Sequence, residues 1–185
     1  MTIPIIIAVV IILVLILVSL YNKLVILKKR VENAWSQIDV QLQRRFDLIP
    51  NLVETVKGYM GHENEIFVKV ADLRTSWANA TSVSEKADLN SQLSDSLKTI
   101  MAVSENYPDL KANMNFSELQ AELKVTEDKI SYSRQFYNDT ATIYNTKISV
   151  VPTNIIANIF GFKDADLFTV DSDEARKNVK VDFNK

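Results

Sequence analysis

The feature that most constrains this chain is an uninterrupted apolar run near its start, IPIIIAVVIILVLILVSL, from Ile3 to Leu20. The run carries no charge, and Ser19 is its only polar residue. As an α-helix it would span roughly 27 Å, close to the hydrocarbon thickness of a bilayer. We therefore expect a transmembrane anchor in residues 1–22.

Two alternatives to an anchor are a cleaved signal peptide and a buried core helix. A signal peptide fits less well, because no basic residue precedes the run and no Ala-x-Ala cleavage site follows it. The length of the run also favours an anchor that stays in the mature protein.

Four positive charges follow the run directly, at Lys23, Lys28, Lys29 and Arg30. By the positive-inside rule they predict a single-pass protein of the cell membrane, with its N terminus outside and the bulk of the chain in the cytoplasm. These four side chains could form a specific lipid site. Cations that reach toward the interface along their aliphatic stems are the plainer interpretation.

The distribution of charge indicates membrane lipid, and not nucleic acid, as a partner. All 21 basic and 23 acidic residues lie beyond the apolar run. Residues 23–45 have a net charge of +4, whereas the rest of the chain has −6. A basic collar beside an otherwise acidic domain suits an anionic membrane surface and lacks the broad basic footprint of a nucleic-acid-binding domain.

Helical periodicity continues from Lys23 almost to the end of the chain. One seam repeats every seven residues through Leu24, Val31, Ile38, Arg45, Leu52 and Tyr59. We expect the first helix to pass from the membrane through this seam, weakened at Gly58 and Gly61, as far as Trp77. Asn79–Ser82 is the first loop signal.

Two further long helices are predicted after that loop. Ser82 or Ser84 can cap the second, which ends near Pro108, and Asn115 opens the third, which ends at Pro152. A seven-residue seam runs along the third helix through Phe116, Leu123, Ile130, Tyr137, Tyr144 and Val151. The predicted fold is all-α: an N-terminal transmembrane helix that continues into an antiparallel bundle of long helices with coiled-coil-like packing in residues 23–152. Residues 153–185 form a tail with one short apolar segment.

Several long motifs of the chain resemble the LemA family. They are YNKLVILKKRVENAWSQIDVQLQRRFDLIPNLVETVKGYMGHE, SENYPDLKANMNFSELQAEL, RQFYND, and YNTKI followed by VVPTNIIA. The resemblance implies a bacterial helical bundle on a membrane helix, without an established enzymatic activity. It also suggests a membrane protein partner such as a metalloprotease, because some family members are encoded near membrane metalloproteases.

The sequence predicts no catalytic residues, no cofactor and no metal. It contains no cysteine and one histidine, His62, so neither a disulfide nor a zinc ribbon is available. His62 with Glu63 and Glu65 could ligate a metal, but a di-iron carboxylate bundle needs two Glu-x-x-His motifs, and the chain has none. Glycine-rich phosphate loops are also absent from the sequence.

Arg45 and Pro50 are unusual residues within the first helical pattern. Arg45 occupies an apolar seam position, so we expect it to be buried and paired with an acidic residue, with Glu127 as the leading candidate. Pro50 lacks the N–H that would bond to the Phe46 carbonyl. A structural kink is the favoured interpretation, with a ligand site as the alternative.

The ENYPDL stretch, with Tyr107 and Pro108, has two interpretations. It could be a recognition turn, since loops often bind partners. The plainer interpretation is a helix stop with Tyr107 folded onto the end of the bundle.

The third helix has a second apolar stripe that one neighbouring helix does not need. It consists of Phe136, Ile143 and Val150, each one position before a seam residue. The tail, with Ile155, Ile156, Ile159 and Phe160, could cover it within one chain or from a neighbouring copy. We expect a homo-oligomer held by this half of the helix and the tail.

Two classes of function remain from the sequence. The first is a membrane-anchored scaffold or adaptor of the bacterial envelope that works through its helical surface. The second is a subunit or regulator of a membrane hydrolase or protease with an unrecognised site. Long helices and a single histidine favour the first, and a buried cavity lined by perturbed carboxylates would favour the second.

Overall fold

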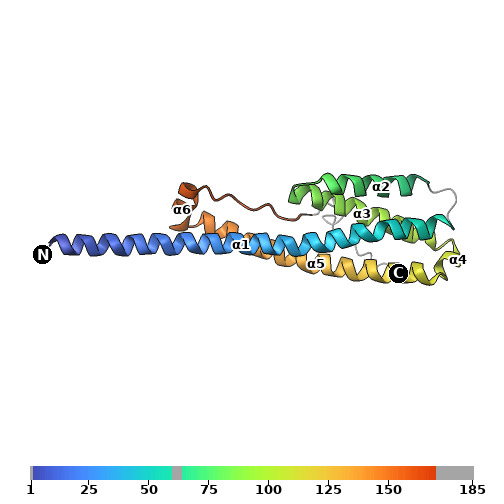
Figure 1. Cartoon of the computed structure of the whole chain (residues 1–185), viewed down its shortest axis with the longest axis horizontal. Helices are drawn as coiled ribbons and strands as arrows, with labels where there is room; N and C mark the ends of the chain where they lie inside the picture. The colour runs from blue at the N-terminus through green and yellow to red at the C-terminus, as the bar shows by residue number, and fades with distance from the viewer. Residues whose placement is uncertain (1, 60–63, 170–185) are drawn as a thin grey trace, which may run out of the picture. The chain divides into compact units, whose positions relative to one another are not determined.

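The computed structural model of the chain describes residues 2–59 and 64–169. Within these residues the regular elements are all helices (Figure 1). They are α1 (Thr2–Lys57), α2 (Asn64–Asn79), α3 (Val83–Ser104), α4 (Pro108–Lys111), α5 (Met114–Ser149) and α6 (Thr153–Phe160). The predicted fold class, an apolar N-terminal helix that continues into an antiparallel bundle of long helices, is confirmed.

The chain divides into two compact units. The first contains the chain up to Arg45 and Leu123–Leu167, and the second contains Phe46–Glu122 and the chain from Phe168 onward. Helices α1 and α5 therefore contribute to both units. The boundary expected after residue 22, between membrane anchor and bundle, and the boundary expected after residue 152, between bundle and tail, both stay predictions.

In the first unit α1 and α5 run antiparallel. Trp35 packs edge-on against Tyr137, with ring centroids 5.6 Å apart, and the later Arg45 pairs with the earlier Glu127. The buried apolar residues of the two helices here are Leu24, Leu27, Val31, Ala34, Ile38, Leu42, Leu123, Ile130, Tyr137, Ala141, Tyr144 and Ile148. Most of them follow each other at intervals of three or four residues, which places them along one face of each helix.

In the second unit the last turns of α1 pack with α2, α3 and the start of α5. Phe46 of α1 stacks on Trp77 of α2 with ring centroids 4.5 Å apart. Between α3 and α5, the Gln120 amide lies 3.0 Å from the Met101 sulfur. In each contact, a residue near the start of one helical segment meets a residue near the end of its neighbour. The last part of α1 therefore runs antiparallel to α2, and α3 runs antiparallel to the start of α5.

A capping box fixes the start of α3. The Ser82 hydroxyl accepts a hydrogen bond from the Glu85 backbone N–H, and the Glu85 carboxylate accepts from the backbone N–H groups of Ser82 and Thr81. Of the two caps that the sequence allows, the protein uses Ser82. The paired bonds satisfy N–H groups that the first turn of a helix leaves without partners.

The expectation of one helix from the membrane to Trp77 is wrong. Helix α1 ends at Lys57, Gly58 and Tyr59 form a turn, and α2 begins at Asn64. Glycine has a low helix propensity, and the turn lets α2 fold back so that Phe46 and Trp77 can stack. The described part of the chain therefore has four long helices and two short ones, where the sequence suggested three long ones.

The ends of α5 also differ from the expectation. The helix starts at Met114, and the Asn113 side chain, not that of Asn115, accepts a hydrogen bond from the Phe116 N–H near its start. At its other end α5 stops at Ser149, before Pro152. Val151 is therefore exposed instead of continuing the buried seam.

Candidate functional site

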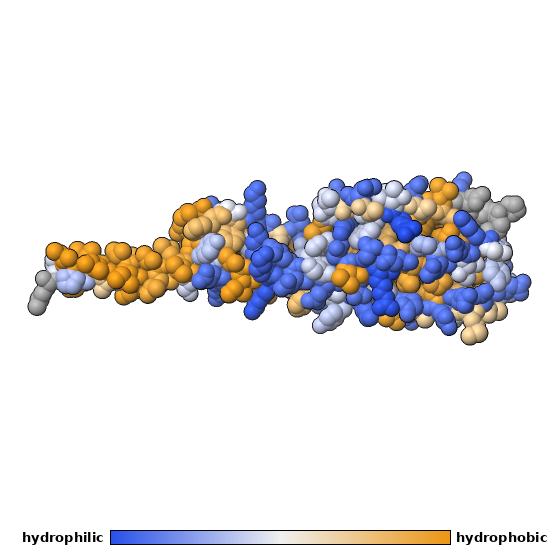
Figure 2. Space-filling model, viewed as in Figure 1, coloured by the Kyte–Doolittle hydropathy of each residue, from blue (hydrophilic) through white to orange (hydrophobic). Residues whose placement is uncertain are grey.

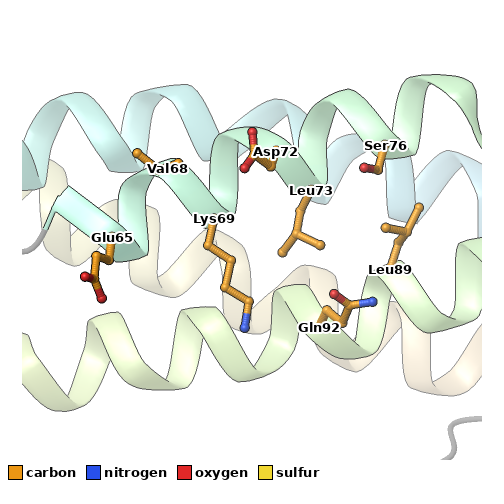
Figure 3. Close-up of a pocket in the computed structure, with 8 residues that line it drawn as sticks. All are labelled: Glu65, Val68, Lys69, Asp72, Leu73, Ser76, Leu89 and Gln92. Atoms are coloured by element: carbon orange, nitrogen blue, oxygen red, sulfur yellow. The ribbon is translucent and has the colours of Figure 1, made fainter.

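A cleft between α2 and α3 is the first candidate for a chemical site. Its volume is about 570 Å³, and it lies within the second unit. Figure 3 shows the Lys69 and Leu73 side chains of α2 and the Gln92 side chain of α3 directed into the space between the two helices. Glu65 and Asp72 also line it. A lysine, two carboxylates and an amide can bind polar groups.

This cleft lacks the parts of a nucleophilic or metal-assisted site. Its lining includes neither histidine nor cysteine, and no cluster of metal-ligating side chains occurs among residues 2–59 and 64–169. Two of the three residues considered as metal ligands, His62 and Glu63, lie outside the described residues, whereas Glu65 lies in the first turn of α2. Among the described lining residues, the groups that could take part in chemistry include the Lys69 amine and the Glu65 and Asp72 carboxylates.

Groups with shifted pKa values in the described ranges have structural explanations. The pKa of Glu85 is lowered by the hydrogen bonds of the capping box. Burial raises the pKa of Tyr137 and of Tyr144. Burial also lowers the pKa of Arg45, although the nearby Glu127 charge opposes that shift. Because each shift accompanies a structural contact, namely the helix cap, the tail contacts or the ion pair with Glu127, these shifts have causes other than catalysis.

Arg45 and Glu127 form the ion pair that the sequence predicts. Nη1 of Arg45 lies 2.7 Å from a Glu127 carboxylate oxygen. The Arg45 side chain is 5% exposed, whereas that of Glu127 is 48% exposed. The pair therefore links a buried guanidinium on α1 to the solvent-facing edge of α5.

A groove between α1 and α5 in the first unit is the second candidate site. It has a volume of about 400 Å³. Its lining residues are Leu27, Arg30, Asn33, Ala34 and Gln37 from α1, and Phe136, Thr140 and Ile143 from α5. Phe136 and Ile143 are 46% and 59% exposed, so the second apolar stripe on α5 remains accessible. Apolar side chains with polar groups around them suit a binding surface better than a reaction site.

The basic residues that follow the apolar run are all exposed, but they have different surroundings. Lys29 pairs with Glu32 at 2.6 Å, whereas Arg30 lines the groove. Lys23 and Lys28 lie on the exposed surface of α1. The four charges therefore form a collar around the helix, and only Arg30 contributes to the groove.

The remaining predicted candidates are not among the residues that line the groove. Pro50 lies inside α1 in the second unit and does not end the helix. Tyr107 is half-buried and precedes the single-turn helix α4, in which Pro108 is the first residue and Leu110 is buried. The ENYPDL stretch thus ends α3 and turns the chain, which leaves its possible recognition role a prediction.

The tail contains a set of contacts that sequence reasoning missed. The Tyr137 hydroxyl donates to the Asp166 carbonyl at 2.5 Å, and the Tyr144 hydroxyl donates to the Lys163 carbonyl at 2.9 Å. The Asn145 side chain donates to the Ala165 carbonyl and accepts from its N–H. We call these contacts of Tyr137, Tyr144 and Asn145 the tail clasp. The sequence did contain a signal for these contacts. Tyr137 and Tyr144 lie seven residues apart in a buried seam, where each hydroxyl needs a hydrogen-bond partner.

The apolar residues of the tail segment have separate environments. Ile156 is buried within the chain, so it is not available to a neighbouring copy as expected. Ile155, Ile159 and Phe160 are exposed on α6. Since Phe136 and Ile143 remain accessible, α6 does not bury the stripe on α5.

An apolar 18-residue stretch of α1 near the N terminus indicates the class of protein. Among the described residues, α1 is the one helix long and apolar enough to cross a membrane, and its apolar window is not buried inside the protein. Figure 2 shows this part of α1 as a surface of hydrophobic side chains. The fold and this helix define a helical-bundle protein with one candidate membrane span.

Comparison with known proteins identifies the family. A model of the LemA family matches residues 34–183. The chain is 28% identical to protein LemA of Metamycoplasma hominis over 164 residues, which cover 88% of this chain and 73% of that protein. The chain belongs to the LemA family, as its motifs predict.

Magnetosome proteins are further relatives. The chain is 28% identical to magnetosome protein MamQ 2 of Paramagnetospirillum magneticum over 174 residues. It is 25% identical to magnetosome protein MamQ of Magnetospirillum gryphiswaldense over the same length. In both comparisons the match covers 80% of this chain and 64% of the relative. This chain thus spans less than two thirds of these MamQ proteins.

Proposed function

We propose that this protein is a membrane-anchored helical scaffold of the bacterial envelope that acts through protein–protein contacts, beginning with contacts between its own copies. The observation that carries the proposal is the groove between α1 and α5, with Phe136 and Ile143 half exposed along it. Exposed apolar side chains next to one another are typical of binding surfaces. The proposal requires no catalytic chemistry.

The composition of the groove supports a protein partner. Leu27 and Ala34 of α1 and Phe136 and Ile143 of α5 provide apolar contact area. The polar side chains of Arg30, Asn33, Gln37 and Thr140 complete the lining. Protein interfaces commonly combine an apolar centre with a polar rim, and arginine and phenylalanine are enriched in them.

A membrane anchor favours contacts between copies of the chain. Copies held by α1 in one membrane share a plane and a vertical register, which raises their effective concentration. The span itself contributes little to close packing, because Ala8 and Ser19 are its only small residues and it contains no Gly-x-x-x-Gly motif. We therefore assign the contact to the groove.

The test is the molar mass of the detergent-solubilised protein over a wide concentration range. Phe136→Glu/Ile143→Glu should reduce the mass to that of one chain, because it places two charges in the contact. The matched control is Gln135→Glu/Thr142→Glu, which changes two exposed residues of α5 at the same seven-residue spacing but on a different face of the helix. A wild-type protein that is monomeric throughout, or equal dissociation by both double variants, would contradict the proposal.

We also propose that the N terminus lies outside and the helical bundle in the cytoplasm. Lys23, Lys28, Lys29 and Arg30 support this orientation through the positive-inside rule. Because the chain has no cysteine, Tyr132→Cys gives a single labelling site on the bundle. A membrane-impermeant maleimide should label it only after the cells are opened. Labelling on intact cells would show that the bundle lies outside the cell and that the proposed orientation is wrong.

A further inference from the structure

We propose that α6 is a second membrane-binding element, which lies in the interface of the same membrane that α1 spans and inserts Ile155, Ile159 and Phe160 among the lipids. The proposal rests on the membrane anchoring in the proposed function. It adds a lipid-binding surface on the C-terminal side of the bundle, far along the chain from the span.

The position of α6 beside α1 is the first argument. Tyr21 directly follows the apolar run, and its ring lies 4.7 Å from that of Phe160 and 5.9 Å from that of Phe162, between centroids. Figure 1 shows α6 alongside α1 within the first unit. The end of α6 is therefore at the level where the run ends at Leu20.

The charge pattern of the two segments is the second argument. On α1 the first charged residue after the apolar run is Lys23, two positions after Tyr21. After α6 the first charged residue is Lys163, directly after Phe162. Between residues 148 and 162 the tail carries no charge. Because Tyr21 contacts Phe162, both segments change from apolar to charged at the same level, as an interface between lipid and water requires.

The two faces of α6 are the third argument. Thr153, Ile156 and Ala157 are buried within the protein. Val151, Ile155 and Ile159 follow at four-residue spacing, and Val151 and Ile159 are 77% and 71% exposed. Figure 2 shows hydrophobic side chains at α6 next to those of the apolar part of α1. A helix with one apolar outer face lies in the plane of a membrane interface, where aromatic rings are also favoured.

Contacts within the protein hold α6 in this position. The Thr153 hydroxyl bonds to the Lys147 and Val150 carbonyls before the helix. After the helix, Tyr144 donates to the Lys163 carbonyl as part of the tail clasp. Since both ends are fixed to α5, the outer face is presented without further folding. This reduces the entropic cost of binding a membrane.

Spin labels at single cysteines test the proposal in the full-length protein. Ile159→Cys reports on α6, Val14→Cys on the span and Tyr132→Cys on an exposed part of α5. The protein is placed in vesicles of phosphatidylcholine with a minor fraction of phosphatidylglycerol. Collision with oxygen, which concentrates in lipid, is then compared with collision with a water-soluble nickel chelate.

We expect the Ile159 label to favour oxygen, as the Val14 label does, whereas the Tyr132 label favours the nickel chelate. If the Val14 label is in lipid and the Ile159 label behaves like the Tyr132 label, α6 does not bind the membrane. The proposal for α6 is then wrong, whereas the membrane anchor is supported. If the Val14 label is also accessible to the chelate, the anchoring itself fails. The Ile159 label could instead be shielded from both reagents and show spin–spin broadening. If dilution with unlabelled protein removes that broadening, α6 contacts a second copy of the chain and not lipid, and the proposal is wrong.

Discussion

The Arg45 guanidinium lies 2.7 Å from the Glu127 carboxylate, and the two side chains have very different exposure to water. Arg45 is buried, and Glu127 is about half exposed. Removing either partner therefore has a different consequence. Glu127 without Arg45 can be hydrated, whereas Arg45 without Glu127 loses a neighbouring negative charge inside the bundle.

Glu127→Ala should lower the free energy of unfolding by about 1–3 kcal/mol, because it leaves a buried charged donor less well compensated. In an Arg45→Met background the same change should be close to neutral, since no buried cation remains. Denaturant unfolding of the four proteins in this cycle gives the coupling directly. Equal effects of Glu127→Ala in both backgrounds would show that the pair is energetically unimportant.

Arg45→Ala should lower the melting temperature clearly, because it removes both the charge and the buried stem of the side chain. Arg44→Ala is the matched control, since Arg44 is the exposed neighbour on α1. Thermal unfolding followed by circular dichroism separates the two. Similar small shifts from both variants would mean that Arg45 behaves as a surface charge.

Tyr144→Phe should loosen the tail, because it removes the hydroxyl that donates to the Lys163 carbonyl while keeping the buried ring. A lost hydrogen bond of this kind costs about 0.5–1.5 kcal/mol. Hydrogen exchange of residues 163–166 should accelerate, whereas exchange in α3 should not change. Tyr132→Phe, on an exposed tyrosine of the same helix, is the control. Unchanged exchange in Tyr144→Phe would contradict the tail clasp.

Alkaline pH should weaken the tail clasp. Burial and the nearby Asp166 raise the pKa of Tyr137, and burial and Asp164 raise that of Tyr144. The folded state therefore favours the protonated hydroxyls. Their contribution is complete below the ordinary tyrosine pKa of about 10 and is lost as the pH rises through the higher folded values.

The double variant Tyr137→Phe/Tyr144→Phe isolates this effect from the titration of lysines. Above about pH 10 the melting temperature of the wild type should fall more steeply than that of the double variant, which has no hydroxyls at these positions. Parallel curves for the two proteins would show that the hydroxyls carry no pH-dependent stability.

Ser82→Ala should destabilise the protein by about 1 kcal/mol, which is typical for the loss of an N-cap side chain. The Ser82 hydroxyl accepts from the Glu85 N–H, whereas Ser84 is exposed in the first turn of α3. Ser84→Ala is therefore the matched control and should have little effect. Urea unfolding of both variants provides the comparison, and equal losses would contradict the assignment of the cap.

Pro50→Ala should raise stability, because α1 continues through this position and alanine restores the N–H that can bond to the Phe46 carbonyl. Thermal unfolding measures the change. A lower melting temperature would instead indicate that the protein needs the bend that proline favours, as the structural-kink interpretation holds.

The sequence predicts the helices and the Arg45–Glu127 pair well, for a physical reason. Periodic burial of apolar residues leaves a direct trace in the sequence, and an arginine in a buried seam needs a partner within reach. The turn after Lys57 was missed because a single glycine costs a helix only about 1 kcal/mol, which is too weak a signal to predict a break. The stacking of Phe46 on Trp77, which accompanies the turn, leaves no pattern in the sequence.

The groove and the tail clasp were harder to predict. The apolar stripe of Phe136 and Ile143 is visible in the sequence, but the opposite wall with Leu27 depends on which helices become neighbours. In the tail clasp, side chains bond to backbone carbonyls of residues 163, 165 and 166. Since every residue has a carbonyl, the accepting segment carries no pattern that a reader could recognise.

Helix α1 continues without a break from the apolar run into the buried seam that begins at Leu24. No loop separates the two, so in the proposed membrane-anchored state the helix is a stiff lever with one end in lipid. A single span adjusts to a thinner or thicker bilayer by changing its tilt. Each such change must reorient Leu24, Ile38 and Arg45 together with it. In that proposed state, a change in bilayer thickness would act mechanically on the first unit.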